Sequence, residues 1–366
     1  LGVVREEVKA ANGAVTHPPT GRSIGYGELT RGEPLAGAIP DDISVTPPQD
    51  WTVAGSAAPK VAARAMVTGA HIFASDVSRP NVLRGKLLRP PAFRATLEEV
   101  ETAAAEMPGV TVVHEGSFVG VVASDERTAS VALGRVRARW AVPDQVSSAG
   151  LFEHLRSHPG APAPRDRGGA TQPFELGSVV MGLAEAGHVV EASYTVAYIA
   201  HAPLETRAAV AEWDGDRVTV WTGTQRPFRV REELAEAFAM PVDRIRVIVP
   251  DTGTGFGGKH SGECAIEASR MARAAGQPVK LVWTREEELT WAYFRPAAVI
   301  DVKAGIRSDG TIVAWEMYTY HAGPNAIRPP YDVPNQRVQF HPAEAPLREG
   351  AYRALSATAN NFARES

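Results

Sequence analysis

The alternation of apolar and polar residues divides the first half of the chain into short segments. Apolar positions at helical spacing predict helices, and alternating or short apolar runs between turn residues predict strands. We expect helices over residues 1–10, 96–107 and 126–140, a hairpin-like piece ending at Leu29, and strands over residues 72–76, 82–89, 110–114 and 118–123. Residues 32–58 and 159–172 are rich in Pro, Gly and Ala, which predicts linkers. The segment between these linkers is typical of an α+β module with two helices on an antiparallel sheet.

The second half shows longer and more regular apolar patterns. Strands are expected over residues 189–198, 210–213, 218–222, 245–249 and 279–283, helices over residues 230–238 and 263–275, and a hairpin over residues 298–304 and 311–320. Ser308, Asp309 and Gly310 supply the turn of that hairpin. These elements predict one large α+β domain, and no internal repeat is evident.

Composition narrows the class of protein. The chain has 366 residues, of which 44% are hydrophobic and 22% charged, as in a globular protein of two or three domains. A net charge of −4 gives no reason to expect nucleic acid or an anionic membrane as a partner, and no apolar run reaches the length of a membrane span. The single cysteine, Cys264, excludes an internal disulfide and an iron–sulfur cluster held by this chain alone; we expect it in the core.

The most informative stretch is a glycine-rich turn, DTGTGFGGKH over residues 251–260, between an expected strand and the helix expected at 263–275. Glycines let backbone N–H groups approach a ligand closely, because no Cβ blocks the way. A turn of this kind before a helix N-terminus suits an anion.

Two phosphate-binding motifs nearly fit this turn. The spacing of its glycines satisfies GxGxxG, but the acidic residue of a dinucleotide site is absent until Glu286. The turn also satisfies GxxxxGK, but His260 stands where a P-loop needs Ser or Thr. Both nucleotide interpretations stay open at this point, beside a glycine turn that binds nothing.

A second motif, WTGTQRP over residues 221–227, follows the strand expected at 218–222. Its glutamine, together with the glycine-rich turn, resembles the molybdenum-binding large subunit of the xanthine dehydrogenase and aldehyde oxidase family. Within this family, the sequence motifs are most similar to those of the isoquinoline 1-oxidoreductase β subunits. The residues that carry the resemblance are TGTGFGGKH at 252–260, LVWTREEE at 281–288, WAYFRP at 291–296, YRAL at 352–355 and TAN at 358–360.

The resemblance implies an α+β fold, with an a/b hammerhead domain followed by part of the molybdopterin-binding domain. The division it implies is residues 1–58 as the end of an N-terminal molybdopterin-binding segment plus linker, 59–157 as the hammerhead domain, 158–175 as a linker and 176–366 as the first part of the molybdopterin-binding domain. The chain is thus interpreted as a fragment of a longer subunit.

The activity that the resemblance implies is hydroxylation of an N-heterocycle such as isoquinoline, or of an aldehyde, with oxygen taken from water. The implied cofactor is molybdopterin cytosine dinucleotide with molybdenum. The implied partners are a small subunit with two [2Fe–2S] clusters, a cytochrome c as electron acceptor, and a small-molecule substrate, in the periplasm or alternatively the cytoplasm. An aldehyde dehydrogenase of the same branch and a non-catalytic cofactor-binding or assembly module are the alternatives.

The resemblance also assigns cofactor-binding roles. Gln225 is expected to donate its side-chain N–H to an oxo ligand of the molybdenum, with a strand-end hydrogen bond as the alternative. Gly255, Phe256, Gly257 and Gly258 are expected to form the turn against the metal, which the pterin holds without direct ligands from the protein. Core packing is the alternative for Phe256.

Arg353 and His260 are expected on the substrate side. The Arg353 guanidinium offers fixed donors to developing negative charge, with a structural salt bridge as the alternative. His260 stands where the family turn often continues with glutamate, and an exposed residue at the start of a helix is the alternative. We further expect His201 and Glu205 as structural supports, and residues 286–288 as a solvated helix start. The family's catalytic base, a glutamate near the C-terminus of the subunit, is expected beyond the end of this sequence.

Overall fold

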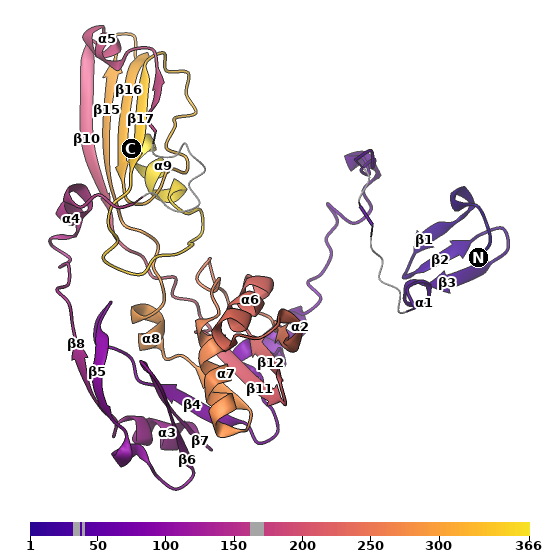
Figure 1. Ribbon diagram of the computed structural model, residues 1–366. Helices are drawn as coiled ribbons and strands as arrows, with labels where there is room; N and C mark the ends of the chain where they lie inside the picture. Colours follow the sequence, from indigo (N-terminus) through magenta and orange to yellow (C-terminus); the bar gives the residue numbers. More distant parts are fainter. Residues whose placement is uncertain (32–36, 39–40, 162–171) are drawn as a thin grey trace. The chain divides into compact units, whose positions relative to one another are not determined.

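A computed structural model describes residues 1–31, 37–38, 41–161 and 172–366 (Figure 1). The chain forms two compact units, Leu1–Gly69 and Ala70–Ser366. Much of the linker expected at 159–172, and parts of the one expected at 32–58, lie outside the described residues. Within the described ranges, no helix has the length and apolar character needed to cross a membrane.

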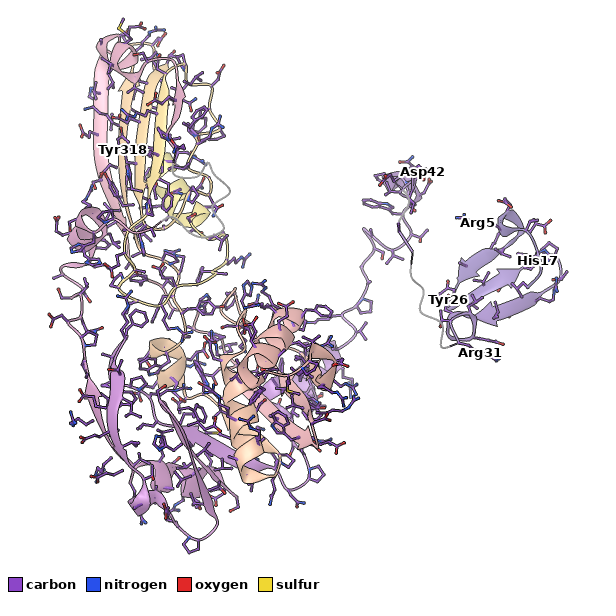
Figure 2. All side chains as sticks on the ribbon, in the orientation of Figure 1. Arg5, His17, Tyr26, Arg31, Asp42 and Tyr318 are labelled. Atoms are coloured by element: carbon purple, nitrogen blue, oxygen red, sulfur yellow. The ribbon has the colours of Figure 1, made fainter. Side chains whose placement is uncertain are left out.

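The first unit is built on a three-stranded antiparallel sheet in the order β1-β2-β3. Its elements are η1 (Arg5–Glu7), β1 (Lys9–Ala11), β2 (Ala14–His17), β3 (Arg22–Gly25), α1 (Tyr26–Leu29), η2 (Pro48–Asp50) and α2 (Ala63–Thr68). The helix expected over residues 1–10 is wrong, because Asn12 and Gly13 adopt left-handed backbones that close a two-residue hairpin between β1 and β2. Figure 2 labels His17, which is buried and lies 2.7 Å through Nδ1 from the Thr20 hydroxyl.

The second unit contains a seven-stranded sheet in the order β13-β12-β11-β14-β4-β7-β6. The strands are β4 (Leu83–Leu87), β6 (Val110–Glu115), β7 (Phe118–Ala123), β11 (Ala208–Asp214), β12 (Arg217–Thr222), β13 (Ile245–Ile248) and β14 (Val279–Val282). The pairs β12–β13 and β14–β4 are parallel, and the other pairs are antiparallel. Helices α6 (Pro227–Phe238) and α7 (Glu263–Ala275) contribute to its largest core cluster, and the burial of Cys264 in that cluster confirms its expected position.

Residues 70–157 differ most from the sequence prediction. The expected helix at 96–107 is wrong: it is strand β5 (Thr96–Glu101) and a short 3-10 turn, η4 (Ala103–Ala105). The expected helix at 126–140 divides into α3 (Glu126–Leu133) and β8 (Arg137–Ala141), and the expected strand at 72–76 is largely the 3-10 helix η3 (Ala74–Asp76). The two helix predictions failed because β5 pairs with β8 in antiparallel fashion, which places Leu97 opposite Trp140, a pairing that no local sequence window contains.

A five-stranded sheet in the order β10-β15-β16-β17-β9 completes the second unit. Its strands are β9 (Phe174–Leu176), β10 (His188–Val196), β15 (Ala298–Ile306), β16 (Ile312–Tyr320) and β17 (Gln336–His341). The accompanying helices are α4 (Leu151–Ser157), α5 (Val179–Ala184) and α9 (Ala357–Glu365). Helix α8 (Arg285–Thr290) follows β14 and pairs with Arg89 and Arg207 instead. The expected hairpin is confirmed as β15–β16. Tyr318 of β16, labelled in Figure 2, donates its hydroxyl to Glu316 at 2.6 Å.

The predicted α+β class is confirmed. The structure adds that β4, from the module expected at 59–157, pairs directly with β14 from the domain expected at 176–366. Strands from both sides of the expected linker therefore belong to one sheet. The domain boundaries given by the resemblance stay a prediction.

Candidate functional site

The glycine-rich turn connects β13 to α7, as the sequence predicted. Thr254, Phe256 and Gly257 have φ angles of 70°, 54° and 97°. A left-handed backbone costs a non-glycine residue on the order of 1 kcal/mol or more. The surroundings must therefore hold Thr254 and Phe256 in place, and several contacts do so.

Gln225 supplies one of these contacts. Its side-chain Oε1 accepts the backbone N–H of Gly257 at 3.0 Å and that of Lys259 at 3.4 Å, and its own backbone N–H donates to the Lys259 carbonyl at 2.9 Å. The side chain is exposed, and no hydrogen bond among the described residues uses its Nε2. Because the oxygen is engaged with the turn, the two N–H donors of the amide are available to a ligand.

All four glycines of the turn are required by close contacts, and a Cβ on Gly253 would lie 2.4 Å from Cβ of Glu205. A Cβ on Gly255 would lie 2.6 Å from Gln225 Oε1, and one on Gly258 would lie 2.7 Å from Cγ of His201. A Cβ on Gly257 would lie 2.7 Å from the carbonyl oxygen of Ala351. Any larger residue at these positions would push the turn away from the elements that hold it.

The apex of the turn presents unengaged backbone donors. The N–H groups of Gly253, Gly257 and Lys259 all donate to side chains of the protein. The N–H groups of Gly255 and Phe256 donate to no other group in the described part of the chain. Since the Phe256 side chain is 41% exposed, core packing does not account for this residue. The backbone N–H groups of the apex and the side-chain N–H groups of Gln225 are therefore donors that have no acceptor among the described residues.

The segment that ends at Arg353 lies against the same turn. The Arg353 backbone N–H donates to the Phe256 carbonyl at 2.8 Å, and the Ala351 carbonyl accepts from His201 Nε2 at 2.7 Å. The Arg353 side chain is exposed. Within the described residues it makes no ion pair, so the structural salt bridge considered for it is not found there.

His260 is the last residue of the turn and is half-buried. Its backbone N–H donates to the Tyr293 hydroxyl at 3.0 Å, and that hydroxyl donates to the Gly257 carbonyl at 2.5 Å. Burial, and then the nearby Arg226, lower the pKa of the His260 ring. The ring is therefore neutral at physiological pH and carries one donor and one acceptor.

Glu205 and Lys259 form a buried ion pair beneath the turn, with 2.9 Å between Oε2 and Nζ. Glu205 also accepts the backbone N–H groups of Ser75 at 2.8 Å and Gly253 at 3.0 Å. Burial alone would raise the pKa of Glu205, but these donors outweigh burial and lower it. Glu205 is thus a fixed carboxylate that supports the turn, which is the role expected for it.

Sequence reasoning missed Arg207, which is almost completely buried. Its guanidinium donates to the Gly258 carbonyl and the Glu288 carboxylate, and it lies 5.4 Å from the centre of the Tyr293 ring. Arg207 therefore holds the turn from below. No local signal in the sequence marks it, because its partners lie far away along the chain.

The expectation of a solvated acidic run at 286–288 is wrong for two of its three residues. Glu288 is 2% exposed and pairs with Arg207. Glu287 pairs with Arg89 at 2.7 Å and forms a capping box with Thr284 at the start of α8. The pattern Thr-x-x-Glu at 284–287 was the sequence signal for that cap.

Comparison with known proteins identifies the family of this chain. The family profile described as "Molybdopterin cofactor-binding domain" matches residues 164–366, more than half of the chain, and the chain belongs to this family. A nicotinate dehydrogenase subunit of Pseudomonas putida is 27% identical over 405 aligned positions, which cover 100% of this chain and 33% of that protein. The nicotine 6-hydroxylase large subunit of Paenarthrobacter nicotinovorans is 28% identical, over 88% of this chain and 47% of that protein.

Solved structures show the same fold. Quinoline 2-oxidoreductase from Pseudomonas putida 86 superposes with a TM-score of 0.71 at 22% identity, over 85% of this chain and 47% of that chain. Aldehyde oxidoreductase from Desulfovibrio gigas gives 0.69 at 20% identity, over 84% of this chain and 40% of that chain. The chain thus spans between a third and a half of the length of these proteins. The predicted membership in the xanthine dehydrogenase and aldehyde oxidase family is confirmed.

The residues of the site fit a molybdopterin cofactor. Its oxygen-bearing groups are acceptors, and the apex of the turn and the Gln225 amide offer donors that the protein itself does not use. The close contacts of Gly255, Gly257 and Gly258 keep the backbone open for such a group. Among the described residues, no cluster of three or more His, Cys, Asp or Glu could bind a metal ion by itself.

Proposed function

We propose that this chain is the cofactor-binding part of a molybdenum hydroxylase, which hydroxylates an N-heterocycle or an aldehyde with oxygen from water. One observation carries the proposal: the side-chain N–H groups of Gln225 and the backbone N–H groups of Gly255 and Phe256 are donors without partners in the described part of the chain. Gln225 is bonded to the turn that holds the other two donors, and Phe256 of that turn also accepts the backbone N–H of Arg353. A molybdopterin cofactor, when bound, would supply the oxygen-transfer and redox chemistry.

In this proposal the residues of the turn bind and orient the cofactor. Gln225 donates to an oxygen ligand through its amide nitrogen, while its amide oxygen keeps the turn in place. Neutral donors suit this task, since they stabilise an oxygen ligand without adding net charge. Gly257 allows the backbone to lie close to Ala351, and Gly258 allows it to lie close to His201, which would hold the turn in place for a cofactor.

Arg353 and His260 orient the substrate. The exposed Arg353 side chain is anchored next to Phe256 and can donate to a ring nitrogen or carbonyl oxygen that gains negative charge. The neutral His260 ring can donate or accept one hydrogen bond. Glu205 is a poor general base, because three donors already hydrogen-bond to its carboxylate and lower its pKa.

The redox partner is proposed to be a small subunit with [2Fe–2S] clusters, with a cytochrome c as a further electron acceptor. The only cysteine, Cys264, is buried, so the chain cannot hold a cluster alone. Two relatives are named as subunits, which supports an assembly of several chains. The cytosine dinucleotide form of the cofactor and a periplasmic location are part of the same proposal.

An N-heterocycle is the substrate class we favour. Nicotinate and nicotine, the substrates in the names of two relatives, contain a pyridine ring, and quinoline is also an N-heterocycle. The second candidate is an aldehyde, since the "Aldehyde oxidoreductase molybdenum-binding subunit PaoC" of Escherichia coli is 29% identical over 64% of this chain. An isoquinoline-like ring stays the specific prediction within the first class.

The test is to purify the complete natural protein with its co-expressed subunits and to measure molybdenum, pterin and dye reduction with N-heterocycles and aldehydes. We expect stoichiometric molybdenum and turnover of an N-heterocycle. Absence of molybdenum from folded, intact protein would contradict the proposal. Molybdenum without turnover of either substrate class would instead support a cofactor-binding or assembly module. Arg353→Lys should lower turnover without lowering the molybdenum content.

A further inference from the structure

Two cationic side chains lie side by side on the seven-stranded sheet. β14 and β4 run parallel, and their register places Lys280 directly opposite Arg84. Side chains alternate between the two faces of a strand, and Leu281 belongs to the core under α7, so Lys280 projects from the other face. A Cβ on Gly85 would lie 2.4 Å from Sδ of Met271 in α7, so Arg84 also projects away from α7. The two cations therefore share the face opposite this helix.

These cations lack ion-pair and hydrogen-bond partners. Neither Arg84 nor Lys280 makes an ion pair or a side-chain hydrogen bond within residues 1–31, 37–38, 41–161 and 172–366. Glu126 lies near both cations but pairs with Lys86, with 2.6 Å between Oε1 and Nζ. Burial, and then Arg84, lower the pKa of Lys280, against the opposing effects of Asp76 and Glu126. Like charges directly opposite each other on neighbouring strands are destabilising, so this face carries excess positive charge.

Arg84 and Lys280 line a pocket of about 310 Å³ together with Ser75, Gly85, Glu126 and Val282. This volume lies at the lower end of the range for small-molecule sites, roughly 300–1,000 Å³. The Ser75 hydroxyl forms no hydrogen bond with another described residue, while its backbone N–H donates to Glu205 at 2.8 Å. The pocket thus combines two cations without ion-pair partners, a hydroxyl donor and the Glu126 carboxylate, which pairs with Lys86, and no residue of the glycine-rich turn lines it.

We propose that this pocket binds an oxyanion of the phosphate class, with Arg84 and Lys280 as its main ligands and Ser75 as a hydroxyl donor. The planar guanidinium can donate two parallel hydrogen bonds to such an anion, and the ammonium group acts as a point charge. A phosphate dianion neutralises both cations, whereas a single carboxylate neutralises only one. The anion can be inorganic phosphate or the phosphate group of a larger molecule. The inference does not depend on the proposed enzymatic function.

The test is calorimetric titration of the complete natural protein with inorganic phosphate, in chloride buffer of constant ionic strength at neutral pH. We expect the natural protein to bind phosphate saturably. The double variant Arg84→Gln/Lys280→Gln should bind it at least roughly tenfold more weakly, because each removed side chain forms a charge-assisted hydrogen bond with the anion. The control variant Arg217→Gln/Arg246→Gln removes two exposed cations from strands β12 and β13 of the same sheet and should bind phosphate normally. A nucleoside monophosphate is titrated in parallel, and tighter binding of one or the other identifies the source of the phosphate group.

Three results would overturn the proposal: no saturable phosphate binding, equal losses in the pocket and control variants, or acetate binding as tightly as phosphate. The pocket variant removes mutually repelling charges, so we expect it to fold. The single variant Lys280→Gln gives the same test with a smaller perturbation. An unchanged molybdenum content in the pocket variant would show that the affected site is separate from the glycine-rich turn, and a parallel loss of molybdenum would contradict that separation.

Discussion

The side-chain oxygen of Gln225 accepts the backbone N–H of Gly257 at 3.0 Å, although the two residues are 32 positions apart in the chain. This bond ties the segment after β12 to the glycine-rich turn and orients the Gln225 amide at the same time. The oxygen stabilises the turn, and the nitrogen is left for a ligand. Substitutions can therefore separate the structural from the functional contribution of this side chain.

Gln225→Glu is expected to keep the turn and lose function. A carboxylate retains an acceptor for Gly257 but replaces the –NH₂ donors with a second acceptor. We expect the free energy of unfolding to stay within about 0.5 kcal/mol of the natural protein. Turnover should fall about 100-fold, as expected on loss of one hydrogen-bond donor to the transition state. The molybdenum content should fall by less than the turnover. Parallel urea unfolding, elemental analysis and dye reduction check this. Natural turnover at equal molybdenum loading would place Gln225 away from the cofactor.

Gly257→Ala is expected to destabilise the protein more than Gly310→Ala. Both glycines have left-handed backbones, with φ of 97° and 88°, so both variants carry the same backbone strain. A Cβ on Gly257 would also meet the Ala351 carbonyl at 2.7 Å, whereas one on Gly310 meets nothing within 4 Å. The difference in the free energy of unfolding should be about 1–3 kcal/mol. Equal losses of unfolding free energy in the two variants, measured by urea unfolding, would show that the turn relaxes freely, and this would argue against a rigid cofactor-binding turn.

Glu205→Gln is expected to remove part of the acid sensitivity of the fold. The donors around Glu205 lower its pKa in the folded state, below about 4.3 in the unfolded chain. Its stabilising contribution is therefore fully present above pH 4.3 and is lost as the pH falls through the folded pKa. At pH 7 the variant should lose about 3 kcal/mol, because it leaves Lys259 buried without its partner.

Urea unfolding between pH 7 and pH 3 measures this difference. The stability of Glu205→Gln should fall less steeply with decreasing pH than that of the natural protein. Glu286→Gln is the control, since Glu286 is exposed and the variant should follow the natural profile. If the slope for Glu205→Gln also matched the natural protein, the pair would not contribute to acid stability.

Tyr198→Phe is expected to loosen the segment that carries Arg353. The Tyr198 hydroxyl donates to Glu349 at 2.8 Å, and the same carboxylate oxygen contacts the ring of His321. Burial, and then Glu349, raise the pKa of Tyr198, so its hydroxyl stays protonated and remains a donor. Loss of a hydrogen bond to a charged group should cost about 1.5–3 kcal/mol.

Tyr331→Phe is the matched control for this prediction. Tyr331 also donates to a carboxylate, that of Glu365, but both residues are exposed. Its loss should change the free energy of unfolding by less than about 0.5 kcal/mol, because water replaces the bond. Similar values for the two variants in thermal or urea unfolding would show that the bond of Tyr198 to Glu349 is not a special anchor.

The sequence by itself determined the elements whose signals are local. The helix expected at 263–275 coincides with α7, and the hairpin around Gly310 is present, because helical periodicity and turn chemistry act within a few residues. The glycine-rich turn was found as a short motif between an expected strand and an expected helix, and Gln225 was found through the resemblance of its motif to the family. Strand β5 was missed, since its conformation depends on pairing with β8 about 40 residues later.

Only the tertiary structure decided which groups of the site are available to a ligand. Arg207 meets Glu288 across 81 positions, and Ser75 meets Glu205 across 130 positions, so no local pattern could reveal these supports. The sequence shows that Gln225 and Phe256 carry donors, but every residue except proline carries a backbone donor. A donor can bind a ligand when the folded chain provides acceptors for the neighbouring donors but none for this one. Likewise, Arg84 and Lys280 become a candidate anion site only because parallel pairing places them opposite each other.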